Sequence, residues 1–325
     1  MVEQSADVER AVRLLAAGEV VGLPTETVYG LAADGSNDSA VRKVFSIKGR
    51  PPGHPVILHV AQPDDVHRYA HAVPPEAERL LRAFWPGPLT LVLPRSALVP
   101  DVVTGGLPTV GLRMPAHPLF LEVARRLGRP LAAPSANRFG RVSPTRAEHV
   151  RLDLGKDVPL VLDGGPCAVG VESTIVDLSG KSPRLRRPGG ITPEDMLERA
   201  DVRVFVDDGE GLPVPGSLPS HYAPRATVVL AASGELWQRV RTEALRRRVG
   251  VVHRGAAPPD LPDSVATVRV GESEQELAHD LYAALRSLDE QGVELVVSVI
   301  PEVASGSVGE AVLDRLKRAS APRPE

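Results

Sequence analysis

A stretch rich in glycine and proline divides this sequence into two parts of different character. Residues 207–225 read DDGEGLPVPGSLPSHYAPR and show no apolar periodicity, which is typical of a linker. Before this stretch, strand-like and helix-like patterns mix without strict alternation, which favours an α/β domain with a partly antiparallel, twisted mixed sheet. After it, short β-branched runs alternate with helices, which favours a smaller, Rossmann-like doubly wound sheet. We expect domains at 1–204 and 226–325, joined by a linker at 205–225.

Apolar spacing and capping signals predict the individual elements. The first domain should open with a helix of about three turns that ends before Gly18. The stretch TETVYGLAADG (25–35) should carry a strand over into a helix, a common place for ligands. Further helices are expected at 38–48, 75–84, 117–127 and 192–200, and strands at 20–24, 56–60, 89–94, 159–165 and 172–178. In the second domain we expect strands at 226–231, 249–253, 265–270 and 293–301, and helices at 234–248, 273–291 and 306–318.

Composition and charge exclude several classes of protein. The 325 residues are 42% hydrophobic and 24% charged, as in an ordinary globular protein. A formal net charge of −3 argues against a general binder of polyanions, so any cationic chemistry must be clustered. The one cysteine, Cys167, excludes an intramolecular disulfide and a thiolate metal cluster, and is read here as a small buried apolar residue rather than a reactive thiol. We find no signal peptide and no apolar membrane span, and expect a cytoplasmic protein.

The common nucleotide and metal motifs are absent from the sequence. Instead, several unusual stretches contain cations and hydroxyl groups, and each taken alone also has an ordinary structural interpretation. Together they suit a phosphate-rich ligand, because arginine offers paired donors, lysine a point charge and hydroxyls directional bonds. The side chains in question are Lys48, Arg50, Arg113, Arg187, Ser135, Asn137, Ser143 and Ser173.

The stretch KGRPPGHPVILH (48–59) carries the strongest of these signals. Its prolines restrict the backbone around Lys48 and Arg50, so the two cations can be presented to a ligand with less ordering cost. The apolar run that follows should anchor the loop in the core. The stretch therefore predicts a preorganised clamp for an anion.

These stretches occur in an order that resembles the threonylcarbamoyl-AMP synthase family, whose longer members join a YrdC-like domain to a smaller C-terminal domain. The resemblance spans nearly the whole chain. It rests on PTETVYGL (24–31), K-x-R-P (48–51), S-x-N (135–137), ESTIVDL (172–178), RRPG (186–189) and HYAP (221–224).

The resemblance implies an L-threonylcarbamoyladenylate synthase, a nucleotidyltransferase. It would convert L-threonine, bicarbonate or carbon dioxide, and ATP with Mg²⁺ into threonylcarbamoyl-AMP and pyrophosphate. The product would pass to proteins that modify tRNA to threonylcarbamoyladenosine, so tRNA would be an indirect partner. Magnesium would be held mostly by phosphates and water, without a dedicated protein metal site.

The resemblance also implies roles for particular residues. The threonine-binding set would be Thr27, His59, Arg113, Ala133 through its backbone, and Ser173, with Arg113 pairing with the substrate carboxylate. The ATP-binding set would be Lys48, Arg50, His54, Thr109, Ser135, Asn137, Ser143, Arg187 and Tyr222. Within it, Lys48, Arg50, Ser135 and Asn137 would form the catalytic tetrad. Without the resemblance, His59 would be read as a hydrogen-bonded strand histidine.

The linker departs from the family pattern, because Leu218, Pro219 and Ser220 stand where a basic or aromatic residue usually precedes HYAP. We expect the linker to act as a lid that brings Tyr222 to the nucleotide. Two alternatives remain open from the sequence. One is an RNA-binding module, which the low aromatic content of 3% disfavours. The other is a carbamoyl transferase to another acceptor, resembling hydrogenase-maturation proteins, whose acylphosphatase and zinc-finger parts this chain lacks.

Overall fold

The computed structural model describes residues 2–206, 213–216, 220–304 and 306–322. The chain separates into two compact units. The first comprises residues 1–139 and 144–217, and the second comprises residues 140–143 and 218–325. The short segment 140–143 therefore belongs to the second unit, although it lies within the domain predicted at 1–204. The predicted domain boundaries themselves stay a prediction.

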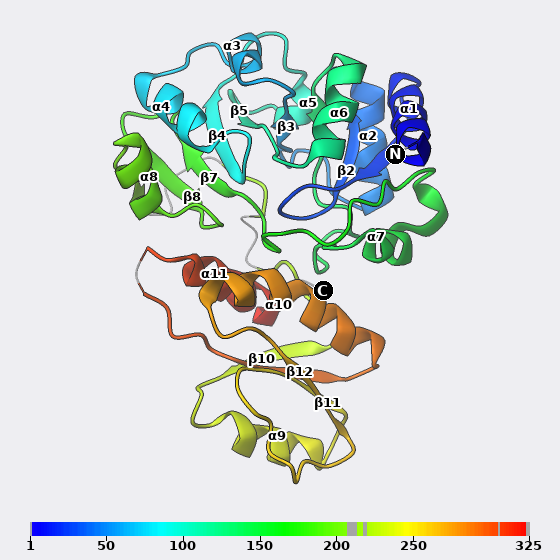
Figure 1. Ribbon diagram of the computed structural model, residues 1–325, viewed down its shortest axis with the longest axis vertical. Coiled ribbons are helices and arrows are strands. Elements are labelled where there is room, and N and C mark those ends of the chain that lie inside the picture. Colours follow the sequence, from blue (N-terminus) through cyan, green and yellow to red (C-terminus); the bar gives the residue numbers. More distant parts are fainter. Residues whose placement is uncertain (1, 207–212, 217–219, 305, 323–325) are drawn as a thin grey trace. The chain divides into compact units, whose positions relative to one another are not determined.

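The first unit is a mixed α/β fold (Figure 1). Its helices are α1 (Val2–Ala16), α2 (Asp38–Lys48), η1 (Pro63–Asp65), α3 (Val66–Tyr69), α4 (Pro75–Phe84), α5 (Asp101–Thr104), α6 (Pro118–Leu127), α7 (Ala147–Leu154), η2 (Gly155–Asp157) and α8 (Pro193–Ala200). Its strands are β1 (Val21–Leu23), β2 (Gly30–Asp34), β3 (Leu58–His59), β4 (Leu89–Pro94), β5 (Thr109–Arg113), β6 (Leu131–Ala132), β7 (Thr174–Asp177), β8 (Arg184–Arg187) and β9 (Phe205–Val206).

Among the described residues these strands form one sheet in the order β1-β2-β6-β3-β5-β4-β7-β8-β9. The pairs β3/β5, β4/β7 and β8/β9 are parallel. The pairs β1/β2, β2/β6, β3/β6, β4/β5 and β7/β8 are antiparallel. The predicted mixed, partly antiparallel sheet is confirmed.

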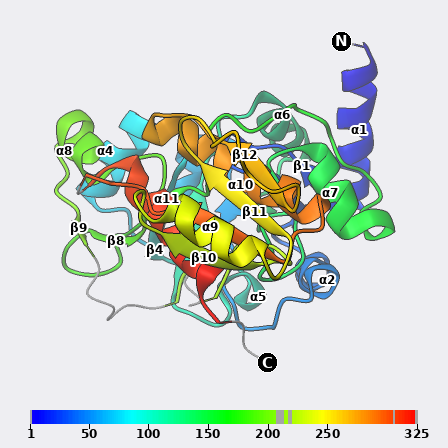
Figure 2. The same ribbon diagram turned by 90° about the horizontal axis from the view of Figure 1, so that it is seen from below.

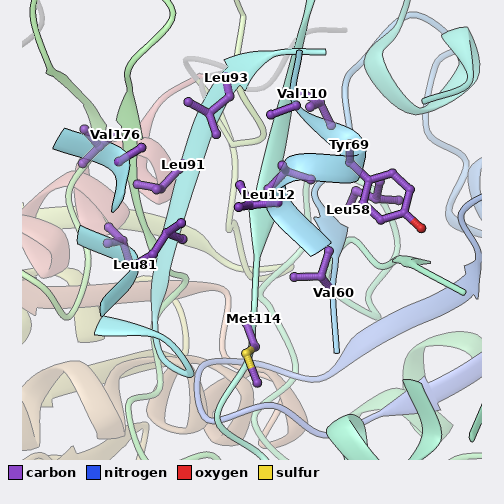
Figure 3. Close-up of a cluster of buried hydrophobic side chains, with 14 of the residues drawn as sticks. Leu58, Val60, Tyr69, Leu81, Leu91, Leu93, Val110, Leu112, Met114 and Val176 are labelled. Carbon is purple, nitrogen blue, oxygen red and sulfur yellow. The ribbon is translucent and has the colours of Figure 1, made fainter. Parts of the chain in front are cut away.

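A large apolar cluster fixes the middle of this sheet. Leu91 on β4 and Leu112 on β5 are fully buried, and they belong to one cluster with Leu58 of β3 and Leu81 of α4 (Figure 3). A second cluster joins α1 and α6 to β1, β2 and β6, and a third joins α2 and α7 to β2 and to Val20, which precedes β1. Because side chains of a strand alternate between the two faces of a sheet, β2 is covered on both faces.

Most predicted elements of the first unit lie where the sequence placed them. Helices α2 and α4 have the predicted bounds, and α8 begins after the capping box of Thr192 with Pro193 in its first turn.

Two local predictions for this unit were wrong. Residues 25–35 do not pass into a helix. The chain turns back as β2, antiparallel to β1, and α2 begins only at Asp38. Residues 159–165 do not form a strand, and only Val161 makes a bridge, to Gly22. Pro159 and the following Gly-Gly pair explain this, because they remove a backbone donor and weaken extended structure.

The second unit contains a parallel sheet of the described strands, in the order β10-β13-β11-β12. Figures 1 and 2 show α9 on one face of this sheet and α10 and α11 on the other. This doubly wound arrangement confirms the predicted Rossmann-like fold. The elements are β10 (Thr227–Ala231), α9 (Leu236–Ala244), β11 (Val249–His253), β12 (Val265–Arg269), α10 (Glu274–Glu290), β13 (Leu295–Val299) and α11 (Val308–Ser320).

We predict that Leu91→Ala lowers the free energy of unfolding of the first unit by about 2–5 kcal/mol, since it leaves a cavity in the central cluster. Denaturation of a Trp237→Phe background, followed by fluorescence, reports on the buried Trp85 of the first unit. Leu98→Ala is the control, because Leu98 is 62% exposed, and should change this free energy by less than about 0.5 kcal/mol. Equal effects of the two substitutions would contradict the assignment of the core.

Candidate functional site

The first of the predicted cations, Lys48, is the buried last residue of α2. Helix α2 ends there because Gly49 adopts the left-handed conformation with φ of 65°, and the amide of Gly49 caps the helix. The Lys48 ammonium donates to the backbone carbonyls of Ser135 and Asn137, and the amide of Phe139 donates to the Lys48 carbonyl at 2.8 Å. Burial, and the nearby Arg50, lower the pKa of Lys48 well below its ordinary value. The K-x-R and S-x-N motifs are thus brought together.

Arg50 lies at the start of the proline-rich loop. Its Nη2 donates to the carbonyl of Pro55 at 2.8 Å, which ties both ends of the loop together. Its guanidinium lies 5.9 Å from the ring centroids of both Phe45 and Phe139, within reach of cation–π interaction. The ring of His54 lies 5.8 Å from that of Phe139. Partial burial and Arg50 lower the pKa of His54.

Arg113, at the end of β5, lies in a separate cluster with the loop after β1. Its Nη2 donates to Glu26 Oε1 at 2.8 Å and to Thr27 Oγ1 at 2.9 Å, and its Nε donates to the Gly87 carbonyl at 3.3 Å. Thr27 Oγ1 also lies 2.8 Å from Thr25 Oγ1. Two of the predicted threonine-binding residues, Arg113 and Thr27, are therefore in direct contact. Glu26 was not predicted.

His59 lies beside this cluster. His59 on β3 is the register partner of Arg113 on β5, and paired residues of parallel strands point to the same face. Its Nδ1 is buried and has no hydrogen-bond partner among the described residues, although the backbone of Leu131 and Ile57 acts on the ring. Burial, and then the charge of Arg113, lower the pKa of His59 from 6.5 to about 3. Ala133 is buried, and its amide donates to the Ile57 carbonyl at 3.3 Å.

Ser173 and Arg187 connect the two predicted binding sets. Arg187 Nη2 donates to Ser173 Oγ at 3.0 Å, and Arg187 Nε donates to the Ser173 carbonyl at 3.0 Å. Ser173 Oγ also lies 2.8 Å from Thr90 Oγ1 on β4. Arg187 Nη1 donates to the carbonyl of Pro215 at 2.9 Å, so part of the predicted linker contacts a predicted ATP ligand.

The remaining predicted residues are less closely connected. Thr109 is buried at the start of β5, where it pairs with Pro94. Ser143 and Tyr222 belong to the second unit. There, Arg286 Nε of α10 donates to the Ser143 carbonyl at 3.3 Å. Tyr222 is 1% exposed and has a positive φ of 60°. Its ring stacks on that of Tyr282 at 5.8 Å.

Leu218 and Pro219, at which the linker departs from the family pattern, lie outside the described residues. Cys167 is buried, and burial raises the pKa of its thiol to about 12, in agreement with its reading as a small apolar residue.

Comparison with known proteins shows the family to which the chain belongs. The family model described as Telomere recombination, for the Sua5, YciO and YrdC proteins, matches residues 13–189. A model for the C-terminal domain of threonylcarbamoyl-AMP synthase matches residues 191–321. A threonylcarbamoyl-AMP synthase of Bacillus subtilis is 41% identical over 327 residues, which cover 97% of this chain and 93% of the relative.

Proteins from Pyrococcus abyssi are similar to this chain both in sequence and in structure. Its threonylcarbamoyl-AMP synthase is 39% identical over 318 residues, which cover 94% of this chain and 92% of the relative. The crystal structure of P. abyssi Sua5 complexed with L-threonine matches 96% of this chain and 94% of its own, with a TM-score of 0.87 and 37% identity. The chain belongs to the threonylcarbamoyl-AMP synthase family. The predicted enzyme class, a synthase acting by nucleotidyl transfer, is confirmed.

Two general properties of the described residues complete this picture. No helix in the part that the structure describes is both long and apolar enough to cross a membrane. No group of three or more His, Cys, Asp or Glu side chains, over the same residues, is arranged to hold a metal ion.

We predict a specific pH dependence from His59. Its pKa is lower in the folded state than in the unfolded state, so between pH 3 and 6.5 the unfolded chain binds the extra proton. The stability that neutral His59 contributes is fully present above pH 6.5 and is lost as the pH falls toward 3.

Between pH 7 and 4 the parent should therefore lose roughly 3 kcal/mol more unfolding free energy than His59→Phe. Denaturation curves of both proteins across this range measure the difference. Parallel pH profiles for the parent and the variant would show that His59 is not held neutral by burial.

Proposed function

We propose that the first unit forms threonylcarbamoyl-AMP and pyrophosphate from L-threonine, bicarbonate or carbon dioxide, and ATP. The observation that carries this proposal is the direct contact between Ser173 and Arg187, because it joins the predicted amino-acid set to the predicted nucleotide set. Ser173 contributes a hydroxyl group to this contact, and Arg187 contributes a buried guanidinium. Such an arrangement suits two substrates that must react with each other.

Arg113 is the proposed receptor of the threonine carboxylate. A guanidinium offers directional donors that match a carboxylate, and Thr27 and His59 lie next to it. Ala133, through its backbone, and Ser173 complete the amino-acid set. The P. abyssi structure with L-threonine supports the proposal that a chain of this fold holds that amino acid.

Lys48, Arg50, Ser135 and Asn137 are proposed to act on ATP as the catalytic tetrad. The buried Lys48 ammonium donates to two backbone carbonyls of the S-x-N motif. The guanidinium of Arg50 is held at the start of its loop by its hydrogen bond to the Pro55 carbonyl. His54, Thr109 and Arg187 belong to the same proposed nucleotide set. Ser143 and Tyr222, from the second unit, remain predicted ATP ligands on the resemblance alone.

The chemistry needs charge neutralisation and positioning. The threonine amine adds to carbon dioxide and loses a proton, which gives a carbamate. A carbamate oxygen then attacks the α-phosphorus of ATP, the bond to the β-phosphate oxygen breaks, and pyrophosphate leaves. Cationic side chains around the phosphates stabilise the charge that develops during this transfer. Magnesium enters as the counterion of ATP, coordinated by phosphate oxygens and water.

The segment before the HYAP motif is proposed to act as a lid. Val214 is 6% exposed and packs with Val92 and Ile175 of the sheet, and the carbonyl of Pro215 accepts a hydrogen bond from Arg187. A segment that contacts a nucleotide ligand can respond to the nucleotide and exclude water from a reactive product. Residues 207–212 and 217–219 of the predicted lid lie outside the described residues.

The product is proposed to pass to proteins that transfer the threonylcarbamoyl group to tRNA. Threonylcarbamoyl-AMP is a mixed anhydride, so an acceptor that uses it must take the acyl group before water does. We place this exchange in the cytoplasm. The reducing environment there suits a chain with one buried, unpaired cysteine.

We predict that Arg50→Ala and Arg113→Ala have separable effects on steady-state pyrophosphate release. Loss of a charge-assisted contact should raise the KM for ATP about tenfold or more in Arg50→Ala, and the KM for L-threonine to the same extent in Arg113→Ala. Arg42→Ala is the matched control, because Arg42 is an exposed arginine of α2 whose side chain pairs only loosely with Asp38, at 3.9 Å. Unchanged KM values in both site variants would rule out the assigned roles.

A further inference from the structure

The carboxylate of Glu26 is held in a rigid loop. Thr25 Oγ1 accepts hydrogen bonds from the amides of Thr27 and Val28, at 3.1 and 3.2 Å, and donates to the Val28 carbonyl at 2.7 Å. The amide of Val169 donates to the Glu26 carbonyl at 2.8 Å. These hydrogen bonds hold the loop between β1 and β2 in one conformation. The side chain of Glu26 therefore projects from the loop in a fixed direction.

Both carboxylate oxygens of Glu26 contact the chain around the end of β5. Oε1 accepts from Arg113 Nη2 at 2.8 Å, and Oε2 accepts from the amide of Ala116 at 3.0 Å. Arg113 ends β5, and Ala116 follows three residues later. One side chain thus fixes both the guanidinium and the backbone that carries it.

The bonds made by Arg113 leave one nitrogen available. Nε donates to Gly87 and Nη2 donates to Glu26 and Thr27, whereas Nη1 has no hydrogen-bond partner among the described residues. Nη1 is also not fully buried. Because the guanidinium is planar, fixing Nε and Nη2 also fixes the direction of Nη1.

The pair of Glu26 and Arg113 is nearly removed from water. The Arg113 side chain is 5% exposed and that of Glu26 is 12% exposed. A buried cation that loses its partner carries an uncompensated charge and tends to move toward water or another acceptor. We therefore expect the Arg113 guanidinium to leave its observed orientation when the Glu26 carboxylate is removed.

We propose that Glu26 is a positioning residue for the amino-acid substrate, which holds the Arg113 guanidinium so that Nη1 faces the substrate carboxylate. Glu26 acts through Arg113 and does not itself contact threonine or ATP. This inference rests on the proposed function in one respect, namely that Arg113 receives the carboxylate of the amino acid.

The test is a double-mutant cycle on the full-length chain. L-Threonine and ATP are titrated separately by calorimetry into the parent, Glu26→Ala, Glu26→Gln, Arg113→Ala and the Glu26→Ala/Arg113→Ala double variant. Glu26→Ala should weaken threonine binding about tenfold or more, with ATP affinity within about twofold of the parent. Glu26→Gln should lie between these proteins, because its amide keeps one of the two acceptor oxygens. The double variant should bind threonine no more weakly than Arg113→Ala alone.

Two controls keep the result interpretable. Glu19 forms an ion pair with Lys43, and the two side chains are each 39% exposed. Glu19→Gln removes one charge of this pair, and the variant should bind threonine as the parent does. If Glu26→Ala fails to unfold cooperatively on heating, Glu26→Gln carries the test. If binding to Arg113→Ala is too weak to titrate, the cycle is completed with kcat/KM for threonine, and the KM for ATP is followed alongside.

The outcomes separate this inference from the function on which it rests. Unchanged threonine binding in Arg113→Ala would refute the role of Arg113 itself. Weakened binding in Arg113→Ala with parent-like binding in both Glu26 variants would overturn the positioning role. A further loss in the double variant beyond Arg113→Ala would show that Glu26 contacts the substrate directly, which also overturns it.

Discussion

Burial of cationic side chains is the constraint on which the rest of the site depends. Lys48, Arg113 and Arg187 are 3%, 4% and 5% exposed, although charged groups of this kind are costly to remove from water. Their hydrogen bonds run largely to backbone carbonyls and hydroxyls, which solvate the charge without cancelling it. Arg113 also has a carboxylate partner at contact distance, Glu26. A site built this way keeps positive charge for an anionic substrate and holds it in place.

The sheet explains why these cations occupy fixed positions. Arg113 and Arg187 end β5 and β8, and Lys48 ends α2, so each side chain leaves an element at its last residue. The apolar cluster around β3, β4 and β5 fixes the strands themselves. Neutral His59 adds a polar group beside Arg113 without a second positive charge, because burial and Arg113 lower its pKa. The arrangement is therefore preorganised before any ligand arrives.

Much of this could be predicted from the sequence, and the failures have physical reasons. The cations and hydroxyls of the K-x-R and S-x-N motifs together indicated a phosphate-rich ligand, and the family resemblance joined the two motifs into one tetrad. Glu26 was missed because an anion was not expected in a cation-rich site, yet it was the lone acidic residue of PTETVYGL. Its role depends on a contact with Arg113, 87 residues away, which no local pattern reveals.

In the second unit, too, local sequence patterns predicted the elements but not the contacts between distant residues. The strands and helices of the doubly wound fold were readable from short apolar runs and capping residues. The transfer of residues 140–143 to this unit was not, because it depends on bonds from Arg286 to the carbonyls of Val142 and Ser143. The burial of Tyr222 against Tyr282 was equally hidden, since a tyrosine in a Pro-rich linker has no local signal for its partner.

We propose that one site joins an amino acid to a nucleotide through a carbamate. The most direct measurement incubates the full-length chain with ATP, L-threonine and ¹³C-bicarbonate, and follows adenylate products by mass spectrometry. We expect threonylcarbamoyl-AMP that carries the ¹³C label and forms only when threonine is present. A folded protein that releases pyrophosphate without this labelled product, or equally well without threonine, would contradict it.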